Sequence, residues 1–168
     1  VIGTSYALMT DFLEEIYIWS ELRGGLLSPN ENRPSIEQLD FFNYNINENN
    51  ELVQWAEFYR VINLANTIIE YAYLAVENDD TFSEARYNGY LAEAYFIRSM
   101  CYFYLVKTFK DVPFITNSYA TDSQDFRIEK SNESDIIEQL IEDLTEVVGS
   151  AFDQDDFEST AEQKGRVT

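Results

Sequence analysis

The stretch YNGYLAEAYFIRSMCYFYLVKTFKDVPFIT, residues 87–116, decides the fold. No proline occurs from about Glu84 to Phe109, and apolar residues recur there every three or four positions, which predicts one long α-helix over about residues 84–109. Pro113 should end it, because proline lacks the backbone N–H and pushes Val112 out of the helical region. The chain should then leave as a short extended segment, residues 112–116.

Two apolar rows run along this predicted helix. The first is interrupted by Arg98 and otherwise consists of Leu91, Tyr95, Tyr102, Leu105 and Phe109. The second, on another face, contains Phe96, Met100 and Phe103. A helix that is apolar on more than one side should be sandwiched between neighbours. We expect Arg98 to have a structural role, with its stem packed and its guanidinium paired to a carboxylate or carbonyl, rather than to anchor a ligand.

Three other segments have helical periodicity. The first, about residues 2–22, has an expected core stripe of Ile2, Tyr6, Met9, Leu13 and Ile16. The second, about residues 52–77, should form an antiparallel hairpin with residues 84–109 around a turn at residues 78–81. Its Asn63 and Asn66 should brace the structure, because buried amides need partners. The third, about residues 132–149, is capped by Ser131 or Asn132, and its expected core stripe is Ile137, Leu140, Ile141, Leu144 and Val148.

Five groups of residues, in order and in register, resemble the SusD/RagB family of glycan-binding lipoproteins. The central group is the quoted stretch, with Ile-Arg inside the helix, then Tyr-Phe-Tyr-Leu-Val, then Phe-Lys-Asp-Val-Pro-Phe-Ile-Thr. That family usually has glycine where this chain has Lys110, a turn position that lysine tolerates less well. The remaining four groups are residues 4–7 with 21–24, residues 55–66, residue 127 with 141–144, and residues 164–168.

The resemblance implies an all-α fold of degenerate tetratricopeptide-like helical hairpins with long loop insertions. It implies that residues 1–168 are the N-terminal helical domain of a longer chain. It further implies a non-enzymatic lipoprotein, exposed at the outer membrane, that binds glycan fragments and passes them to a SusC-like TonB-dependent transporter for nutrient uptake. The signal and lipid anchor would precede this chain and would be its only link to the membrane. The alternative is a helical-repeat module that binds another protein and no sugar.

The long loop, residues 23–51, is the candidate ligand-binding region, because structureless connections of this length are often functional. Sugar recognition needs aromatic faces for pyranose rings beside amides for the hydroxyl groups. The residues that supply both are Trp19, Arg23, Phe41, Phe42, Tyr44 and Asn45. Residues 41–47 alternate in polarity and are expected to be extended, with one apolar and one amide face. Alternatively, these aromatic side chains fasten the loop onto the helices at residues 52–77 and 84–109.

Charge and composition exclude several classes of function. Acidic residues outnumber basic ones 31 to 11, and the net charge of −20 disfavours nucleic acid, anionic lipid and anionic polysaccharide, so a glycan ligand should be neutral. The chain has no histidine, which removes Ser-His-Asp, Cys-His and histidine-metal chemistry; carboxylate pairs leave a glycoside hydrolase as a third possibility. The acidic run at residues 153–158 lacks the spacing of a calcium loop and is expected to be a solvated loop. We expect no metal, no cofactor and a buried Cys101.

Overall fold

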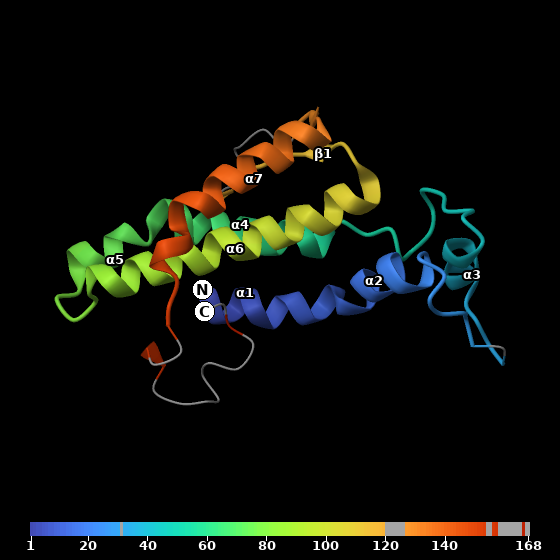
Figure 1. The fold of residues 1–168 in the computed structure, drawn as a ribbon, viewed down its shortest axis with the longest axis horizontal. Helices are drawn as coiled ribbons and strands as arrows, with labels where there is room; N and C mark the ends of the chain where they lie inside the picture. Colours follow the sequence, from blue (N-terminus) through green and yellow to red (C-terminus); the bar gives the residue numbers. More distant parts are fainter. Residues whose placement is uncertain (31, 120–126, 154–155, 158–165, 167–168) are drawn as a thin grey trace.

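The computed structural model describes residues 1–30, 32–119, 127–153, 156–157 and 166. Its centre is α6 (Glu84–Phe109), with α4 (Ala56–Tyr71) alongside, α7 (Glu133–Val147) on one side and α1 (Ile2–Met9) on the other (Figure 1). The all-α fold is confirmed, and the helix expected over residues 84–109 has those bounds. Within the described ranges, none of the helices combines the length and the apolar character that crossing a bilayer requires.

The N-terminal region is helical over residues 2–22, as predicted, but it is not one regular helix. A 3₁₀ turn, η1 (Thr10–Phe12), separates α1 from α2 (Leu13–Tyr17), and a π-helical segment, η2 (Ile18–Leu22), follows. These changes of helical pitch rotate the later side chains relative to α1. The predicted stripe is therefore wrong at Leu13, which is exposed, while Phe12, Ile18 and Trp19 are buried.

The helix predicted over residues 52–77 begins four residues later, at Ala56, and is broken at Ala72 into α4 and α5 (Tyr73–Asn78). The turn that follows is held by Asp79, whose carboxylate accepts hydrogen bonds from the Thr81 N–H (2.9 Å) and hydroxyl (2.6 Å). Ser83 then caps α6 by accepting from the Arg86 N–H. The antiparallel hairpin of α4 and α6 is confirmed.

The segment after α6 folds back over the hairpin. Lys110 ends the helix with φ 64°, and β1 (Val112–Pro113) then pairs antiparallel with β2 (Lys130–Ser131). Asn66 donates to the carbonyl groups of Ile115 (3.0 Å) and Asn117 (3.1 Å). The Asn63 side-chain amide donates to the Tyr119 carbonyl (3.2 Å) and accepts from the Tyr119 N–H (2.6 Å), as the backbone of a neighbouring β-strand would. The structural role predicted for both asparagines is confirmed.

Arg98 joins three helices inside the protein. Its guanidinium donates to Asn66 Oδ1 on α4 (3.1 Å) and pairs with the Asp143 carboxylate on α7, and both charged groups are buried. Gln139 donates to the second Asp143 oxygen (3.1 Å). The structural interpretation of Arg98 is therefore confirmed.

This ion pair also corrects the predicted core face of α7. Because Asp143 must face Arg98, the buried positions are Ile136, Leu140, Asp143 and Val147. The predicted stripe is wrong at Ile141 and Val148, which are exposed. Asn132, one of the two residues predicted to cap this helix, is the N-cap of α7, and its side-chain oxygen accepts from the Ser134 N–H (3.0 Å).

Candidate functional site

The long loop contains a helix that the sequence analysis did not predict. Ser35 and Gln38 form a capping box, in which the Ser35 hydroxyl accepts from the Gln38 N–H and the Gln38 side chain accepts from the Ser35 N–H. They begin α3 (Ile36–Phe42), and a turn follows at residues 43–44, so the extended conformation expected over residues 41–47 is wrong at residues 41–44. The S-x-x-Q spacing at residues 35–38 is the signal that could have revealed it.

Two of the six predicted ligand residues lie in the core. Trp19 is 4% exposed, stacks on Phe58 of α4 (5.0 Å between ring centroids) and donates its indole N–H to the Leu52 carbonyl (2.8 Å). Phe109 of α6 meets the same indole edge-on at 5.1 Å. Phe41 is fully buried. Trp19 and Phe41 therefore pack in the hydrophobic core, as the alternative interpretation expected, and neither ring is accessible to a ligand.

The other four predicted residues lie together where η2 meets the end of α3, and we call them the α3 surface: Arg23, Phe42, Tyr44 and Asn45. Tyr44 is 70% exposed and adopts φ 58°, and its hydroxyl donates to the Arg23 carbonyl (2.8 Å). Phe42 is 38% exposed. Asn45 donates its side-chain amide to Asp40 (3.4 Å), and the Arg23 guanidinium donates to the Thr108 carbonyl (3.4 Å).

The α3 surface has the chemistry that a neutral sugar needs. Phe42 and Tyr44 provide exposed aromatic rings, and the Asn45 amide and the Arg23 guanidinium, from the same end of the loop, are hydrogen-bonding groups. Hydrogen bonds from the backbone N–H of Glu37 and from Ser35 lower the pKa of the Glu37 carboxyl, which stays ionised at neutral pH beside this surface. Asp40, which accepts from the Asn45 amide, adds a negative charge at this end of the loop, and the Arg23 guanidinium adds a positive one.

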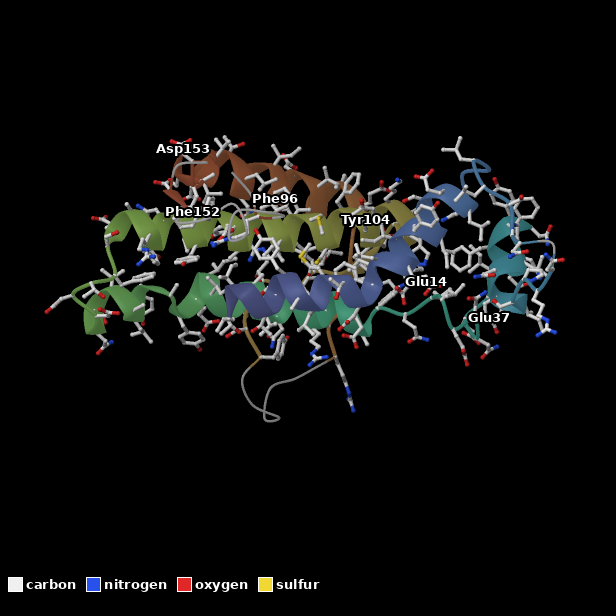
Figure 2. The ribbon with its side chains drawn as sticks, turned by 90° about the horizontal axis from the view of Figure 1, so that it is seen from below. Glu14, Glu37, Phe96, Tyr104, Phe152 and Asp153 are labelled. Atoms are coloured by element: carbon white, nitrogen blue, oxygen red, sulfur yellow. The ribbon has the colours of Figure 1, made fainter. Side chains whose placement is uncertain are left out.

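This surface is at one end of the molecule. Figure 1 shows α3 beyond α2, at the opposite end from α5, and Figure 2 shows Glu37 of α3 far from Phe152 and Asp153. Asn50, which is buried, braces the end of the loop by donating to the Glu37 carbonyl (3.2 Å) and accepting from the Leu52 N–H (3.0 Å). These bonds hold the end of the loop against α3.

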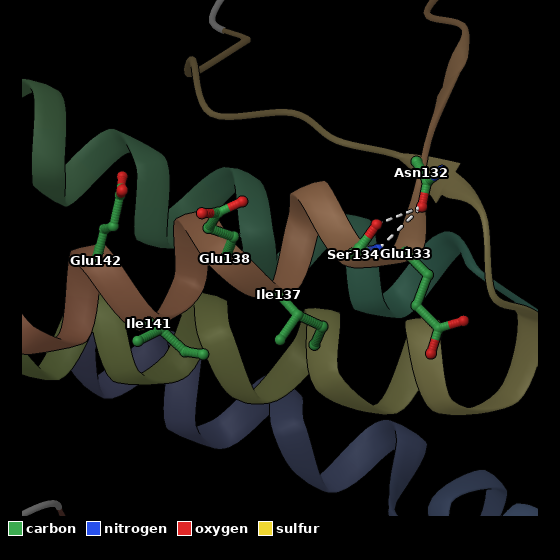
Figure 3. Close-up of a pocket in the computed structure, with 7 residues that line it drawn as sticks. All are labelled: Asn132, Glu133, Ser134, Ile137, Glu138, Ile141 and Glu142. Carbon is green, nitrogen blue, oxygen red and sulfur yellow. Dashed lines mark hydrogen bonds between the residues drawn. The ribbon is translucent and has the colours of Figure 1, made fainter.

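A hollow lies on the outer side of α7, and the acidic side chains in its lining are Glu133, Glu138 and Glu142 (Figure 3). It has no aromatic side chain and is open to solvent, so it lacks the ring-stacking surface of the α3 surface. Within the described ranges, no three acidic or cysteine side chains approach closely enough to hold a metal ion. Residues 154, 155 and 158 of the acidic run lie outside the described residues, so its interpretation as a solvated loop stays a prediction.

Comparison with known proteins decides the family. A family model with the description "Starch-binding associating with outer membrane", SusD-like_3, matches residues 28–161. The chain belongs to the SusD-like family. Among curated proteins, SusD-like protein P2 of Formosa agariphila is 33% identical over 125 residues, which are 73% of this chain and 24% of that protein. SusD-like protein P25 of the same organism is 30% identical over 129 residues, 71% of this chain and 23% of that protein.

Solved structures show the same fold. A SusD superfamily protein from Bacteroides thetaiotaomicron superposes with a TM-score of 0.78 at 23% identity, over 89% of this chain and 33% of that chain. A laminarin-binding SusD-like protein superposes with a TM-score of 0.73 at 22% identity, over 99% of this chain and 36% of that chain. The matched part of this SusD-like chain covers only about a quarter of the length of those curated relatives.

Proposed function

We propose that the protein containing this SusD-like chain binds a neutral glycan at the cell surface. In this proposal the chain contributes the α3 surface to the glycan site. The observation that carries the proposal is the family match over residues 28–161, whose description names starch binding at the outer membrane. One structural relative is a laminarin-binding protein, which is consistent with a neutral glucan. The exposed rings of Phe42 and Tyr44 supply the matching chemistry in this chain.

The proposed role is capture rather than catalysis. The chain has no histidine, and the buried Arg98–Asp143 pair joins helices and is not open to a substrate. The protein would be a lipoprotein of the outer membrane that hands its glycan to a SusC-like TonB-dependent transporter during nutrient uptake. The acidic surface would keep it away from anionic lipid and polysaccharide.

The test is native affinity electrophoresis of the full-length protein in gels that contain starch, laminarin or a polyuronate. We expect retardation by at least one neutral glycan and none by the polyuronate. Turnover of the retained glycan would identify a hydrolase and contradict a capture role. Absence of retardation in every gel would contradict glycan binding.

A second candidate function is protein–protein interaction without sugar binding, and one observation favours it. Apolar side chains of α6 and α7, including Phe103 and Ile141, are exposed. Co-purification of a transporter with a full-length protein that no glycan retards would support this function.

A further inference from the structure

Tyr44 follows α3 in a backbone conformation that favours glycine. The N–H of Asn45 donates to the Asp40 carbonyl (2.8 Å), and the N–H of Tyr44 donates to the Phe41 carbonyl (3.3 Å). These two bonds form a Schellman motif, and Tyr44, with φ 58°, is its left-handed residue. Glycine is favoured at such a position because a Cβ is strained at positive φ. A tyrosine here therefore lowers the stability of the protein.

The chain uses glycine at the same position of a second motif of this kind, at the end of η2. There the Leu26 N–H donates to the Glu21 carbonyl (3.2 Å), and the Gly25 N–H donates to the Leu22 carbonyl (3.3 Å). Gly25, with φ 74°, is the left-handed residue. A Cβ added at Gly25 would have nothing within 4 Å, so the cost of a side chain there is conformational and not steric. Both motifs lie at the end of the molecule where α3 lies beyond α2 (Figure 1).

Packing does not explain the tyrosine at position 44. Tyr44 is 70% exposed, so its ring contributes little to the core. The hydrogen bond from its hydroxyl to the Arg23 carbonyl (2.8 Å) lies at the surface, where water competes for both groups. The ring that holds the end of α3 is Phe41, which is fully buried. Burial and fastening therefore do not offset the strain at Tyr44.

Arg23 fixes the direction of the Tyr44 ring. Its carbonyl accepts from the Tyr44 hydroxyl, and its guanidinium donates to the Thr108 carbonyl in the last turn of α6 (3.4 Å). The ring is thus connected through Arg23 to the end of α6. A side chain that is already fixed loses less conformational freedom when a ligand binds. The Tyr44 oxygen also keeps a lone pair that accepts from a sugar hydroxyl while its proton is donated to Arg23.

Strain alone does not mark a binding residue. Lys110 is the other non-glycine residue with positive φ within the described ranges, and its side chain is long and flexible. The Tyr44 side chain is instead a rigid ring that is exposed and directed by a hydrogen bond. The C–H face of a pyranose packs on such a ring. Binding of a neutral sugar thus accounts for tyrosine at position 44, and structure does not.

We propose that Tyr44 is the aromatic contact that carries most of the glycan affinity of the α3 surface, and that Arg23 is its positioning residue. Tyrosine stands at a position that favours glycine because the ring, held by Arg23, presents a face to a pyranose before the ligand arrives. The inference rests on the proposed function and deepens it. Tyr44→Gly therefore has two opposite effects, a gain in stability and a loss of glycan affinity.

Urea unfolding and calorimetric titration of the full-length protein test these two effects, with soluble starch and laminarin as the probes. For Tyr44→Gly we expect a higher urea midpoint than in the wild type and an affinity at least about ten-fold weaker. Gly25→Ala is the matched control for the conformational cost of a side chain, and it should lower the midpoint. Lys110→Gly should raise the midpoint and leave the affinity unchanged.

A double-mutant cycle tests the positioning role of Arg23. Tyr44→Phe keeps the ring and removes the hydroxyl, so we expect an affinity about five-fold weaker at an unchanged urea midpoint. Arg23→Met removes the bond to Thr108 and should weaken binding by a similar factor in the wild-type background. In the Tyr44→Phe background it should have little further effect, because the ring is no longer joined to residue 23.

Three results would overturn the assignment and leave the proposed function standing. A midpoint for Tyr44→Gly at or below that of the wild type would show that the tyrosine serves the structure of the loop. Wild-type affinity in Tyr44→Gly would show that the ring does not contact the glycan. Equal losses from Arg23→Met in both backgrounds would show that Arg23 does not act through Tyr44. A wild-type protein that binds neither starch nor laminarin would contradict the proposed function, and this inference with it.

Discussion

Replacing Asp143 by asparagine should strongly destabilise the protein, because it leaves the Arg98 guanidinium charged and buried without a counter-ion. Breaking one partner of a buried ion pair typically costs about 3–5 kcal/mol. Asparagine keeps one acceptor oxygen for Arg98 but carries no charge, so a hydrogen bond survives where the ion pair is lost. Because one hydrogen bond can be kept, we expect the lower end of that range, about 3 kcal/mol.

Urea unfolding followed by circular dichroism at 222 nm measures this loss as a lower transition midpoint at constant slope. Glu142→Gln removes one negative charge from the exposed side of the same helix and should change stability by less than about 0.5 kcal/mol. The double variant Arg98→Met with Asp143→Leu removes both charges and should regain about 2 kcal/mol relative to Asp143→Asn. A loss below about 1 kcal/mol for Asp143→Asn, or a double variant no more stable than the single one, would refute the assignment of this pair as the link between α6 and α7.

Two further predictions concern the segment that follows α6. Lys110 has φ 64°, which strains any residue with a Cβ, so Lys110→Gly should stabilise the protein by about 1 kcal/mol. The control Lys107→Gly lies inside the helix and should cost about 1 kcal/mol in the same unfolding assay. A loss of stability at both positions would show that residue 110 is unstrained. Hydrogen bonds from the Ser118 hydroxyl and N–H lower the pKa of Glu70 from its usual 4.5. The stabilisation by these hydrogen bonds is complete above pH 4.5 and is lost as the pH falls through the pKa that Glu70 has in the folded protein. Glu70→Gln should therefore make the free energy of unfolding less steeply dependent on pH below 4.5. An unchanged pH profile would contradict the link between Glu70 and Ser118.

The sequence predicted α6 and its end because each depends on local signals. Apolar residues recur every three or four positions without a proline over residues 84–109, and Pro113 blocks continuation after Lys110. Asn63 and Asn66 were assigned correctly because a buried amide must find partners, whatever the fold. Their partners lie about 50 residues away, and no periodicity could have identified the backbone of residues 115–119 as those partners.

The errors occurred where long-range contacts override local pattern. In α7 the apolar stripe that included Ile141 was a reasonable core face, but the pairing of Asp143 with Arg98 turned a neighbouring face inward. In α1 and α2, a 3₁₀ turn changed the periodicity and placed Phe12 in the core in place of Leu13. Neither change has a signal within the affected segment.

The ligand-binding role of the candidate site stays a prediction, but the structure shows how its residues are arranged. The region was selected by composition, and the structure brings Arg23 and Tyr44 together although they are 21 residues apart. Composition could not separate the rings that hold the loop, Trp19 and Phe41, from the exposed Phe42, because burial depends on the turn that α3 makes. The capping box at Ser35 is the local signal that would have placed Phe41 and Phe42 on a helix instead of in an extended segment.

Isothermal titration calorimetry of the full-length protein with a neutral glycan that retards it in gels measures whether the α3 surface binds sugar. The variant Phe42→Ala/Tyr44→Ala removes both exposed rings, and Tyr73→Ala removes an exposed ring of α5 at the opposite end of the molecule. We predict an affinity at least about ten-fold weaker for the double variant, with an unchanged helical circular dichroism spectrum, and the wild-type affinity for Tyr73→Ala. Wild-type affinity in a folded Phe42→Ala/Tyr44→Ala protein would contradict the assignment and place the glycan site on another surface.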